Sequence, residues 1–243
     1  MIMNSKGTIQ EDTLYSNELG EEVTLLIYLP PAFSPLYKYN LLIAQDGKDY
    51  FQFGRIGRVA DELHINHQIA DSIIVGIPYS TVQNRREKYH PNGTQNKAYI
   101  RFLAHELVPY LDEQFPTFQM GLGRGLIGDS LGATVSLMTA LKYPHTFGKL
   151  ILQSPLVNDH VLETVRKFDH YHLLEMDHII GTGETAVKTT IHTTEDFLAP
   201  NRALSQLLQS TNADYTYEEF DGDHTWKHWQ PYIAKMLVKM FPS

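Results

Sequence analysis

The pattern of apolar and polar residues predicts a regular alternation of strands and helices along the chain. Short, mostly apolar runs predict strands at residues 21–29, 40–45, 72–77, 124–127, 149–153, 178–181 and 215–220. Apolar residues spaced three and four positions apart predict helices at residues 55–68, 96–115, 133–141, 161–168, 202–209 and 231–240. This alternation is typical of an α/β fold, in which a mostly parallel central sheet carries helices on both faces.

Length and composition narrow the class of protein. No repeat and no linker rich in Pro, Gly or Ser divides the 243 residues, so we expect one domain over residues 1–243. The net charge of −8 argues against a nucleic-acid or anionic-membrane partner, because either would need a basic surface. The absence of cysteine from the sequence excludes disulfides, cysteine-ligated zinc and thiol catalysis.

Nothing in the sequence indicates a targeting or membrane segment. Residues 1–13 lack the apolar centre of a signal peptide. No run approaches the roughly 18 apolar residues that a membrane span needs. We therefore expect a cytoplasmic protein with no membrane partner.

One short motif indicates nucleophilic chemistry. The pentapeptide Gly128-Asp129-Ser130-Leu131-Gly132 has the pattern G-x-S-x-G and lies between a predicted strand and a predicted helix. On such a turn, glycines on either side let the backbones approach closely and leave the serine hydroxyl exposed above the sheet. Ser130 is therefore a candidate nucleophile, and a plain glycine-rich turn is the competing interpretation.

A serine nucleophile needs a histidine base and an acid that orients the base. In α/β-hydrolases these residues follow one another in the order serine, acid, histidine. His224 follows the last predicted strand and is the candidate base, with His228 as its rival. The two histidines lack the glutamate of an H-E-x-x-H motif, so no metal site is expected.

Two residues compete for the role of the acid. Glu184 comes just after the predicted strand 178–181, in the loop that an α/β-hydrolase uses for its acid. Asp196 lies twelve residues further on, where it could equally cap a helix. A serine–histidine pair without a strong acid is the third alternative.

The tetrahedral intermediate of acyl transfer needs two backbone N–H donors. One is expected from Leu131, directly after the candidate nucleophile. The second is expected from the loop after strand 40–45, where Gly47 lets the chain turn so that the Lys48 amide points inward. An Asp-Gly pair at this position is also compatible with a simple turn.

Further short motifs occur in a fixed order from about residue 19 to residue 241. They are Ile27-Tyr28-Leu29-Pro30-Pro31, Gln45-Asp46-Gly47 with Tyr50-Phe51, Val75-Gly76-Ile77, Arg85-Arg86-Glu87-Lys88-Tyr89, Glu106-Leu107-Val108-Pro109-Tyr110, Tyr143-Pro144 with Phe147-Gly148, Gln153-Ser154-Pro155, and Gly222-Asp223-His224-Thr225-Trp226 with Trp229. Together with the serine motif, they resemble the Putative esterase family of α/β-hydrolases. That family includes ferric-enterochelin esterases, S-formylglutathione hydrolases, feruloyl esterases and mycolyltransferases.

The resemblance implies an α/β-hydrolase fold with Ser130 as nucleophile, His224 as base, and Leu131 with Lys48 as oxyanion donors. It implies Glu184 as the acid, in a turn of the form Gly-x-x-acid. The sequence departs from the family pattern in two places. Asp223 replaces the second glycine before the histidine, and a long stretch at 186–200 follows Glu184, which leaves Asp196 open as the acid.

The expected site is open. Only about one helix fits between Ser154-Pro155 and the next strand, so there is no room for a large lid. Gly47, Tyr50 and Trp226 are expected to contact substrate, although Trp226 and Trp229 could instead pack the last helix onto the sheet. Arg85 and Arg86 are expected to meet an anionic substrate group, or else to form surface ion pairs worth under about 1 kcal/mol.

We therefore expect a serine carboxylesterase that hydrolyses small soluble acyl esters through an acyl-enzyme, with no cofactor. Its expected partner is the small-molecule ester, and a homodimer is compatible with the sequence. One alternative is an esterase of ferric catecholate-triester siderophores. The other is a non-catalytic binding protein with an α/β-hydrolase fold. A serine peptidase is disfavoured, because it would usually carry an added propeller or cap domain.

Overall fold

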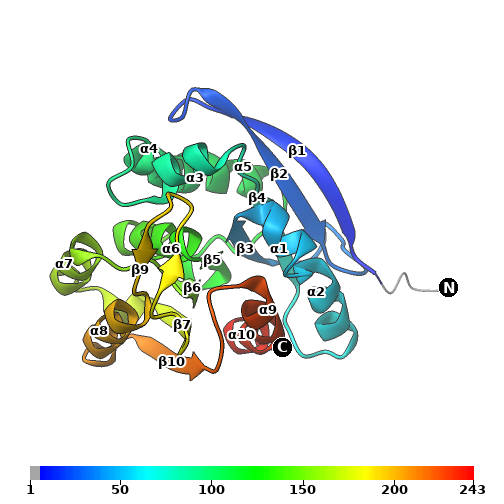
Figure 1. Ribbon diagram of the computed structural model, residues 1–243. Helices are drawn as coiled ribbons and strands as arrows, with labels where there is room; N and C mark the ends of the chain where they lie inside the picture. Colours follow the sequence, from blue (N-terminus) through cyan, green and yellow to red (C-terminus); the bar gives the residue numbers. More distant parts are fainter. Residues whose placement is uncertain (1–5) are drawn as a thin grey trace.

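The computed structural model describes residues 6–243 and is built around a central sheet of eight strands (Figure 1). The strands are β1 (Thr8–Ser16), β2 (Glu21–Leu29), β3 (Asn40–Gln45), β4 (Ser72–Ile77), β5 (Arg124–Asp129), β6 (Lys149–Gln153), β7 (Glu175–Gly181) and β10 (Asp214–Phe220). Their order across the sheet is β1-β2-β4-β3-β5-β6-β7-β10. The β1–β2 and β2–β4 pairs are antiparallel and the other pairs are parallel, which confirms the mostly parallel sheet.

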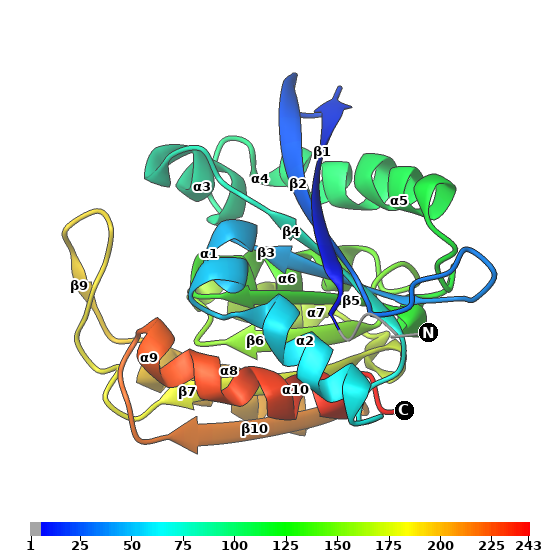
Figure 2. The same ribbon diagram turned by 90° about the vertical axis from the view of Figure 1, so that its right-hand side faces the viewer.

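Helices cover both faces of this sheet, as the sequence predicts (Figure 2). One face carries α3 (Val82–Tyr89), α4 (Asn96–Phe102), α5 (Val108–Gln114), α6 (Leu131–Lys142), α7 (Asp159–Lys167) and α8 (Leu198–Gln209). The other carries α1 (Gly47–Gln52), α2 (Ile56–Ile65), α9 (Trp226–Trp229) and α10 (Ile233–Met240). A π-helical turn at Leu103–Leu107 joins α4 to α5. No helix within residues 6–243 has the length and apolarity needed to cross a membrane.

The elements that the sequence prediction missed include β1, α1 and α3, which are polar or short. Strand β1 lies at the sheet edge, and most of its residues are exposed. Helix α1 has only six residues. Helix α3 has a polar sequence, and Thr81 caps it by accepting a hydrogen bond from the Asn84 amide at 3.0 Å.

The stretch at 186–200 folds back on itself beside the carboxyl ends of the parallel strands. It forms a short hairpin of β8 (Val187–Lys188) and β9 (Thr194–Glu195), followed by the start of α8, and Figure 1 shows it outside the main sheet. The amides of Phe197 and Leu198 donate to the carbonyl of Glu184 at 2.9 and 3.1 Å. These bonds bring the residues just after the hairpin back to Glu184, which lies between β7 and the hairpin. No large lid covers this edge in the part of the chain that the structure describes.

Strand β5 passes directly into α6 through a strained turn at Ser130. The residue has φ 52° and ψ −124°, a conformation that non-glycine residues rarely adopt. Gly128 and Gly132 pack backbone against backbone, because a methyl group on Gly128 would lie 2.2 Å from the Gly132 carbonyl carbon. Gly128 is therefore required by the close approach of strand and helix, whereas a methyl group on Gly132 would meet Gln45 and Asp46 at 3.1 Å.

We predict that Gly128→Ala lowers the free energy of unfolding by about 2–3 kcal/mol, because the added methyl group must push the strand and helix apart. The matched control is Gly57→Ala within α2, where the nearest atom would lie at an ordinary 3.4 Å. That control should be neutral or stabilise by up to about 1 kcal/mol. Urea unfolding of both variants measures the difference, and equal effects would contradict the account.

Candidate active site

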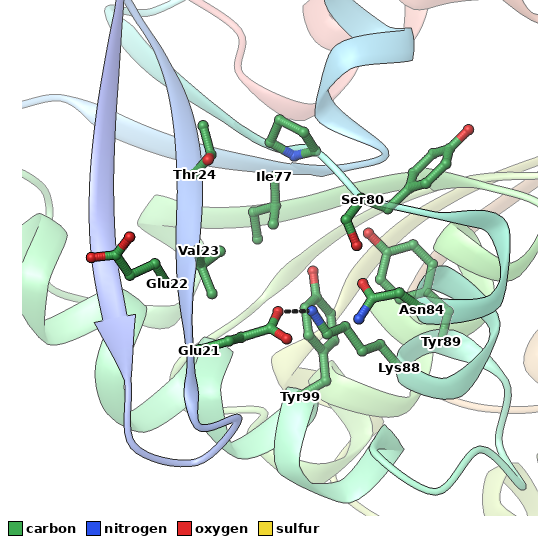
Figure 3. Close-up of a pocket in the computed structure, with 12 residues that line it drawn as sticks. Glu21, Glu22, Val23, Thr24, Ile77, Ser80, Asn84, Lys88, Tyr89 and Tyr99 are labelled. Carbon is green, nitrogen blue, oxygen red and sulfur yellow. Dashed lines mark hydrogen bonds and ion pairs between the residues drawn. The ribbon is translucent and has the colours of Figure 1, made fainter.

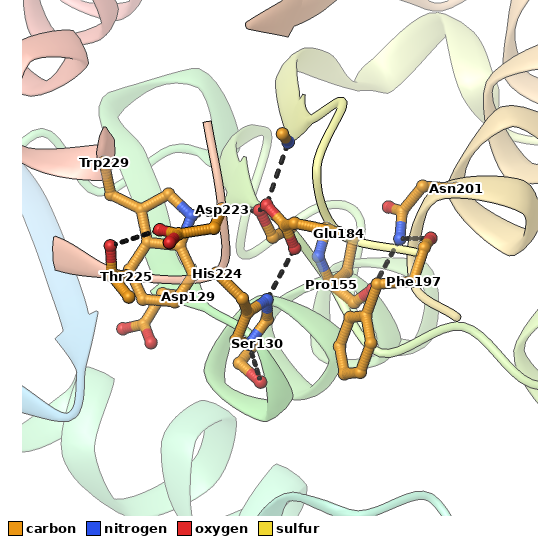
Figure 4. A network of polar contacts seen from close by, with 12 residues as sticks. Asp129, Ser130, Pro155, Glu184, Phe197, Asn201, Asp223, His224, Thr225 and Trp229 are labelled. Carbon is orange, nitrogen blue, oxygen red and sulfur yellow. Dashed lines mark hydrogen bonds and ion pairs between the residues drawn. The ribbon is translucent and has the colours of Figure 1, made fainter. Parts of the chain in front are cut away.

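Ser130 and His224 come together at the carboxyl edge of the sheet, although 94 residues separate them. The Oγ of Ser130 lies 3.0 Å from Nε2 of His224, within hydrogen-bond distance (Figure 4). His224 comes from the loop after β10, and its ring packs against Phe197 on one side and Trp229 on the other, with centroids 4.5 and 4.7 Å away. The imidazole is therefore held in place by two aromatic walls.

Glu184 completes a hydrogen-bonded chain. Its Oε2 lies 2.6 Å from Nδ1 of His224, and the glutamate side chain is fully buried. Its other oxygen, Oε1, accepts from Ser154 Oγ at 2.6 Å and from the Gly181 amide at 2.8 Å. Since an ionised carboxylate is only an acceptor, these donors satisfy it and orient it toward the imidazole.

The loops that carry Glu184 and His224 are fastened to each other. Thr182 and Gly183 donate their amides to the carbonyls of Phe220 and Gly222, both at 2.8 Å. Trp229 reaches the same region from α9, because its Nε1–H donates to Ser154 Oγ at 2.9 Å. No sequence pattern indicates this supporting role of Ser154, because it depends on β6 and β7 lying side by side in the sheet.

The rival residues lie elsewhere. Asp196 is exposed, and its Oδ1 accepts a hydrogen bond from the Ala199 amide at 3.1 Å, which is a helix-capping arrangement at the start of α8. His228 lies 2.7 Å from the carboxylate of Asp223 through its Nδ1. Ser130 is therefore hydrogen-bonded to His224 and not to His228. His224 in turn is hydrogen-bonded to Glu184 and not to Asp196.

The two expected amide donors lie at the beginnings of two helices. Leu131 is the first residue of α6 and Lys48 the second residue of α1. Amides in a first helical turn have no acceptor within their own helix, so both are free to bind an anion. The two loops touch, because a methyl group on Gly132 would lie 3.1 Å from Oδ2 of Asp46.

Several residues expected to contact substrate are instead part of the protein interior. Tyr50 is fully buried, its hydroxyl donates to Gln153 Oε1 at 2.9 Å, and Trp226 packs edge-on against its ring at 4.8 Å. Gly47 is buried against Gly76, where a methyl group would lie 2.3 Å from the carbonyl carbon. Only Trp226 of these three is partly exposed. The expectation for Tyr50 and Gly47 therefore needs correction: both are buried residues of α1, where Gly47 packs against Gly76 of β4 and Tyr50 bonds to Gln153 of β6.

The basic run on α3 is largely paired rather than free. Arg85 forms a two-pronged ion pair with Asp46, with contacts of 2.8 and 2.5 Å, so the expectation that it is an exposed anion-binding residue is corrected. Lys88 pairs with Glu21 inside a polar pocket between β2 and α3 (Figure 3). Arg86 instead lines a pocket that also includes Phe197, the neighbour of His224.

Comparisons with known proteins decide the family. The sequence matches the family described as Putative esterase over residues 16–240. The chain belongs to this family. It is 57% identical over 234 residues to the uncharacterised protein YjcH of Bacillus subtilis (strain 168), covering 96% of this chain and 98% of that protein. It is 22% identical to an acetyl esterase of Caldicellulosiruptor saccharolyticus, over 96% of this chain and 97% of the relative.

A solved structure shows the same fold. The enterobactin esterase FES from Shigella flexneri, solved in the presence of enterobactin, superposes with a TM-score of 0.82 at 18% identity. The match covers 96% of this chain and 58% of the Shigella chain. The α/β-hydrolase fold of the Putative esterase family is thereby confirmed, and carboxylic ester hydrolysis is the activity class that the family supports. Within residues 6–243, no group of three or more His, Asp or Glu residues is arranged to hold a metal ion.

In this member of the family, the residue before the nucleophile candidate is a buried acid. Asp129 is 6% exposed, and its Oδ1 has no hydrogen-bond partner among the residues that the structure describes. In Figure 4 its carboxyl group lies on the opposite side of Ser130 from Phe197. Burial, reinforced by the negative charge of Asp46 and opposed by Arg85, raises the pKa of Asp129 to about 8.

We predict a pH-dependent stability difference between the wild type and Asp129→Asn. Because the folded-state pKa lies above the ordinary 3.8, the stabilisation from the protonated form is complete below about pH 4 and is lost as the pH rises through 8. The uncharged amide has no such loss. Urea unfolding at pH 5 and pH 9 should show the variant gaining stability relative to the wild type at the higher pH. A difference independent of pH would contradict the burial of an ionisable Asp129.

Proposed function

We propose that this esterase is a serine carboxylesterase that hydrolyses small soluble acyl esters through an acyl-enzyme intermediate. The observation that carries the proposal is the continuous chain Ser130–His224–Glu184, with contacts of 3.0 and 2.6 Å. A serine hydroxyl is a weak nucleophile, and a neutral imidazole within hydrogen-bond reach activates it. The buried carboxylate keeps the proton of that imidazole on Nδ1, so that Nε2 faces the serine as an acceptor.

The proposed reaction follows from this arrangement. His224 takes the proton of Ser130 as the oxygen attacks the ester carbonyl. The amides of Leu131 and Lys48 bind the oxyanion that develops. His224 then delivers its proton to the leaving alkoxide, and water repeats the sequence on the acyl-enzyme.

The shape of the site supports a small soluble substrate. Between the end of β6 and the start of β7 the chain forms only α7 and one short 3₁₀ turn, Tyr171–Leu173, and between β7 and α8 it forms only the β8–β9 hairpin. A site without a large lid has no element for activation at a lipid interface. The full-length similarity to an acetyl esterase supports the same size of acyl group.

The charge around the site argues against the siderophore alternative. Glu195 at the end of β9 and the exposed Asp196 line the same pocket as Phe197, which packs against His224, and Arg85 is already paired with Asp46. Ferric catecholate complexes are anionic and would be repelled by exposed carboxylates. Among the basic residues of α3, Arg86 lines a pocket together with Phe197. It is therefore the residue with which an anionic siderophore would pair.

We predict that Ser130→Ala lowers kcat on p-nitrophenyl acetate or butyrate by about 10⁴–10⁶-fold, because it removes the nucleophile. Circular dichroism of the variant should remain that of the wild type. Faster hydrolysis of a ferric catecholate triester than of any p-nitrophenyl ester would favour the siderophore alternative. A wild-type chain that hydrolyses none of these esters would favour a binding protein.

The identity of the acid is tested by a matched pair of variants. Glu184→Gln should lower kcat by about 10⁴-fold, because an amide in place of the carboxylate no longer holds the correct tautomer of His224. Asp196→Asn should retain the wild-type kcat, because its side chain caps α8. The steady-state kinetics of both variants on one ester settle the question, and the reverse pattern would make Asp196 the acid.

A further inference from the structure

We propose that Arg85 is a positioning residue. It fixes the position of the Lys48 loop relative to the Ser130 turn, and these two segments supply the two halves of the oxyanion hole. This inference rests on the proposed function. Arg85 belongs to α3 and lies 45 positions before the nucleophile candidate in the sequence. The guanidinium nevertheless bonds to both loops at the carboxyl edge of the sheet.

The first attachment is to the loop after β3. Arg85 donates from Nε to Asp46 Oδ1 at 2.8 Å and from Nη2 to Asp46 Oδ2 at 2.5 Å. The two side chains are 12% and 2% exposed, so water screens the pair weakly. Tyr79 and Tyr89 lie beside the guanidinium, with ring centroids 5.8 and 5.4 Å from it. Because the planar guanidinium of Arg85 is bound at two points and bordered by two rings, its orientation is fixed.

The partner of this guanidinium, Asp46, has an unusual backbone conformation. It has φ 54° and ψ 43°, in the left-handed region that favours glycine. Its carbonyl accepts from the Asp49 amide at 2.8 Å and thereby starts α1, and its own amide donates to the Tyr89 hydroxyl at 3.3 Å. Lys48 lies two residues later, so the conformation of Asp46 decides where the Lys48 amide points.

The second attachment is to the turn that carries the nucleophile candidate. Nη2 of Arg85 lies 3.4 Å from the main-chain carbonyl oxygen of Asp129, the residue before Ser130. The carboxylate of Asp46 rests against Gly132, two residues after Ser130. Arg85 and Asp46 therefore bridge the β3 loop and the β5 turn, which carry the amides of Lys48 and Leu131. A substrate anion at Arg85 would meet the charge of Asp46, which favours positioning over substrate binding.

The test compares kcat and KM of Arg85→Ala and Arg85→Lys on a p-nitrophenyl ester. Removal of an oxyanion donor typically lowers kcat by about 10²–10³-fold, and we expect a fall approaching this range with little change in KM. Lysine keeps the charge but loses the fork, so Arg85→Lys should also be impaired. Millimolar guanidinium should partly restore kcat in Arg85→Ala, whereas the same concentration of sodium chloride should not.

Arg124 provides the matched structural control. It is also buried, at 7% exposure of its side chain, and it pairs with Asp112 at the opposite end of β5. Arg124→Ala should lower the urea midpoint of unfolding without a corresponding fall in kcat of the folded enzyme. If Arg85→Ala behaves like this control, or raises KM at constant kcat, the positioning role is wrong. If Ser130→Ala retains full activity, the proposed function itself fails, and the two failures are thereby distinguished.

Discussion

The close packing of β5 against α6 is the constraint on which the site depends. Two glycine backbones meet at a distance that no side chain would allow, and the residue between them is forced to φ 52°. Such a conformation costs on the order of 1–3 kcal/mol and persists only where the surroundings hold it. Here the Ser130 amide donates to the Gln153 carbonyl at 2.9 Å, which ties the turn to β6. The strained turn presents the hydroxyl above the sheet and leaves the Leu131 amide free at a helix start.

The parallel sheet then gathers the other groups around this turn. The carboxyl ends of β3, β5, β7 and β10 lie along one edge, so loops distant in sequence become neighbours. A hydrogen-bonded series runs from Trp229 through Ser154, Glu184 and His224 to Ser130. On the other side of the turn, Arg85 bonds to Asp46 in the loop of Lys48 and to the carbonyl of Asp129. In the proposed mechanism, one side orients the base and the other orients the backbone donors.

Much of this could be predicted from the sequence, because burial leaves a strong imprint on composition. The central strands are fully buried and therefore apolar, and β3, β4 and β6 have the predicted limits. The neighbourhood of Ser130, His224 and Glu184 follows from chain order and from the edge at which their strands end. The choice between Glu184 and Asp196 needs the structure. Glu184 contacts His224, whereas Asp196 lies at the start of α8, after the hairpin has returned to Glu184.

The directions of individual side chains could not be predicted in this way. Tyr50 and Arg85 lie on polar segments, α1 and α3, whose stability comes from tertiary contacts rather than from an apolar face. A tyrosine or an arginine in such a segment is compatible with either a ligand or an interior partner. The burial of Asp129 beside the nucleophile candidate has no sequence signature apart from its place in the motif.

The most direct test of the account is covalent labelling of the native chain with a fluorophosphonate, followed by peptide mass spectrometry. If His224 activates Ser130, one phosphonate adduct forms, on Ser130; it disappears in Ser130→Ala and forms much more slowly in His224→Ala. No adduct, or an adduct on another serine, would contradict the assignment of Ser130 as an activated nucleophile.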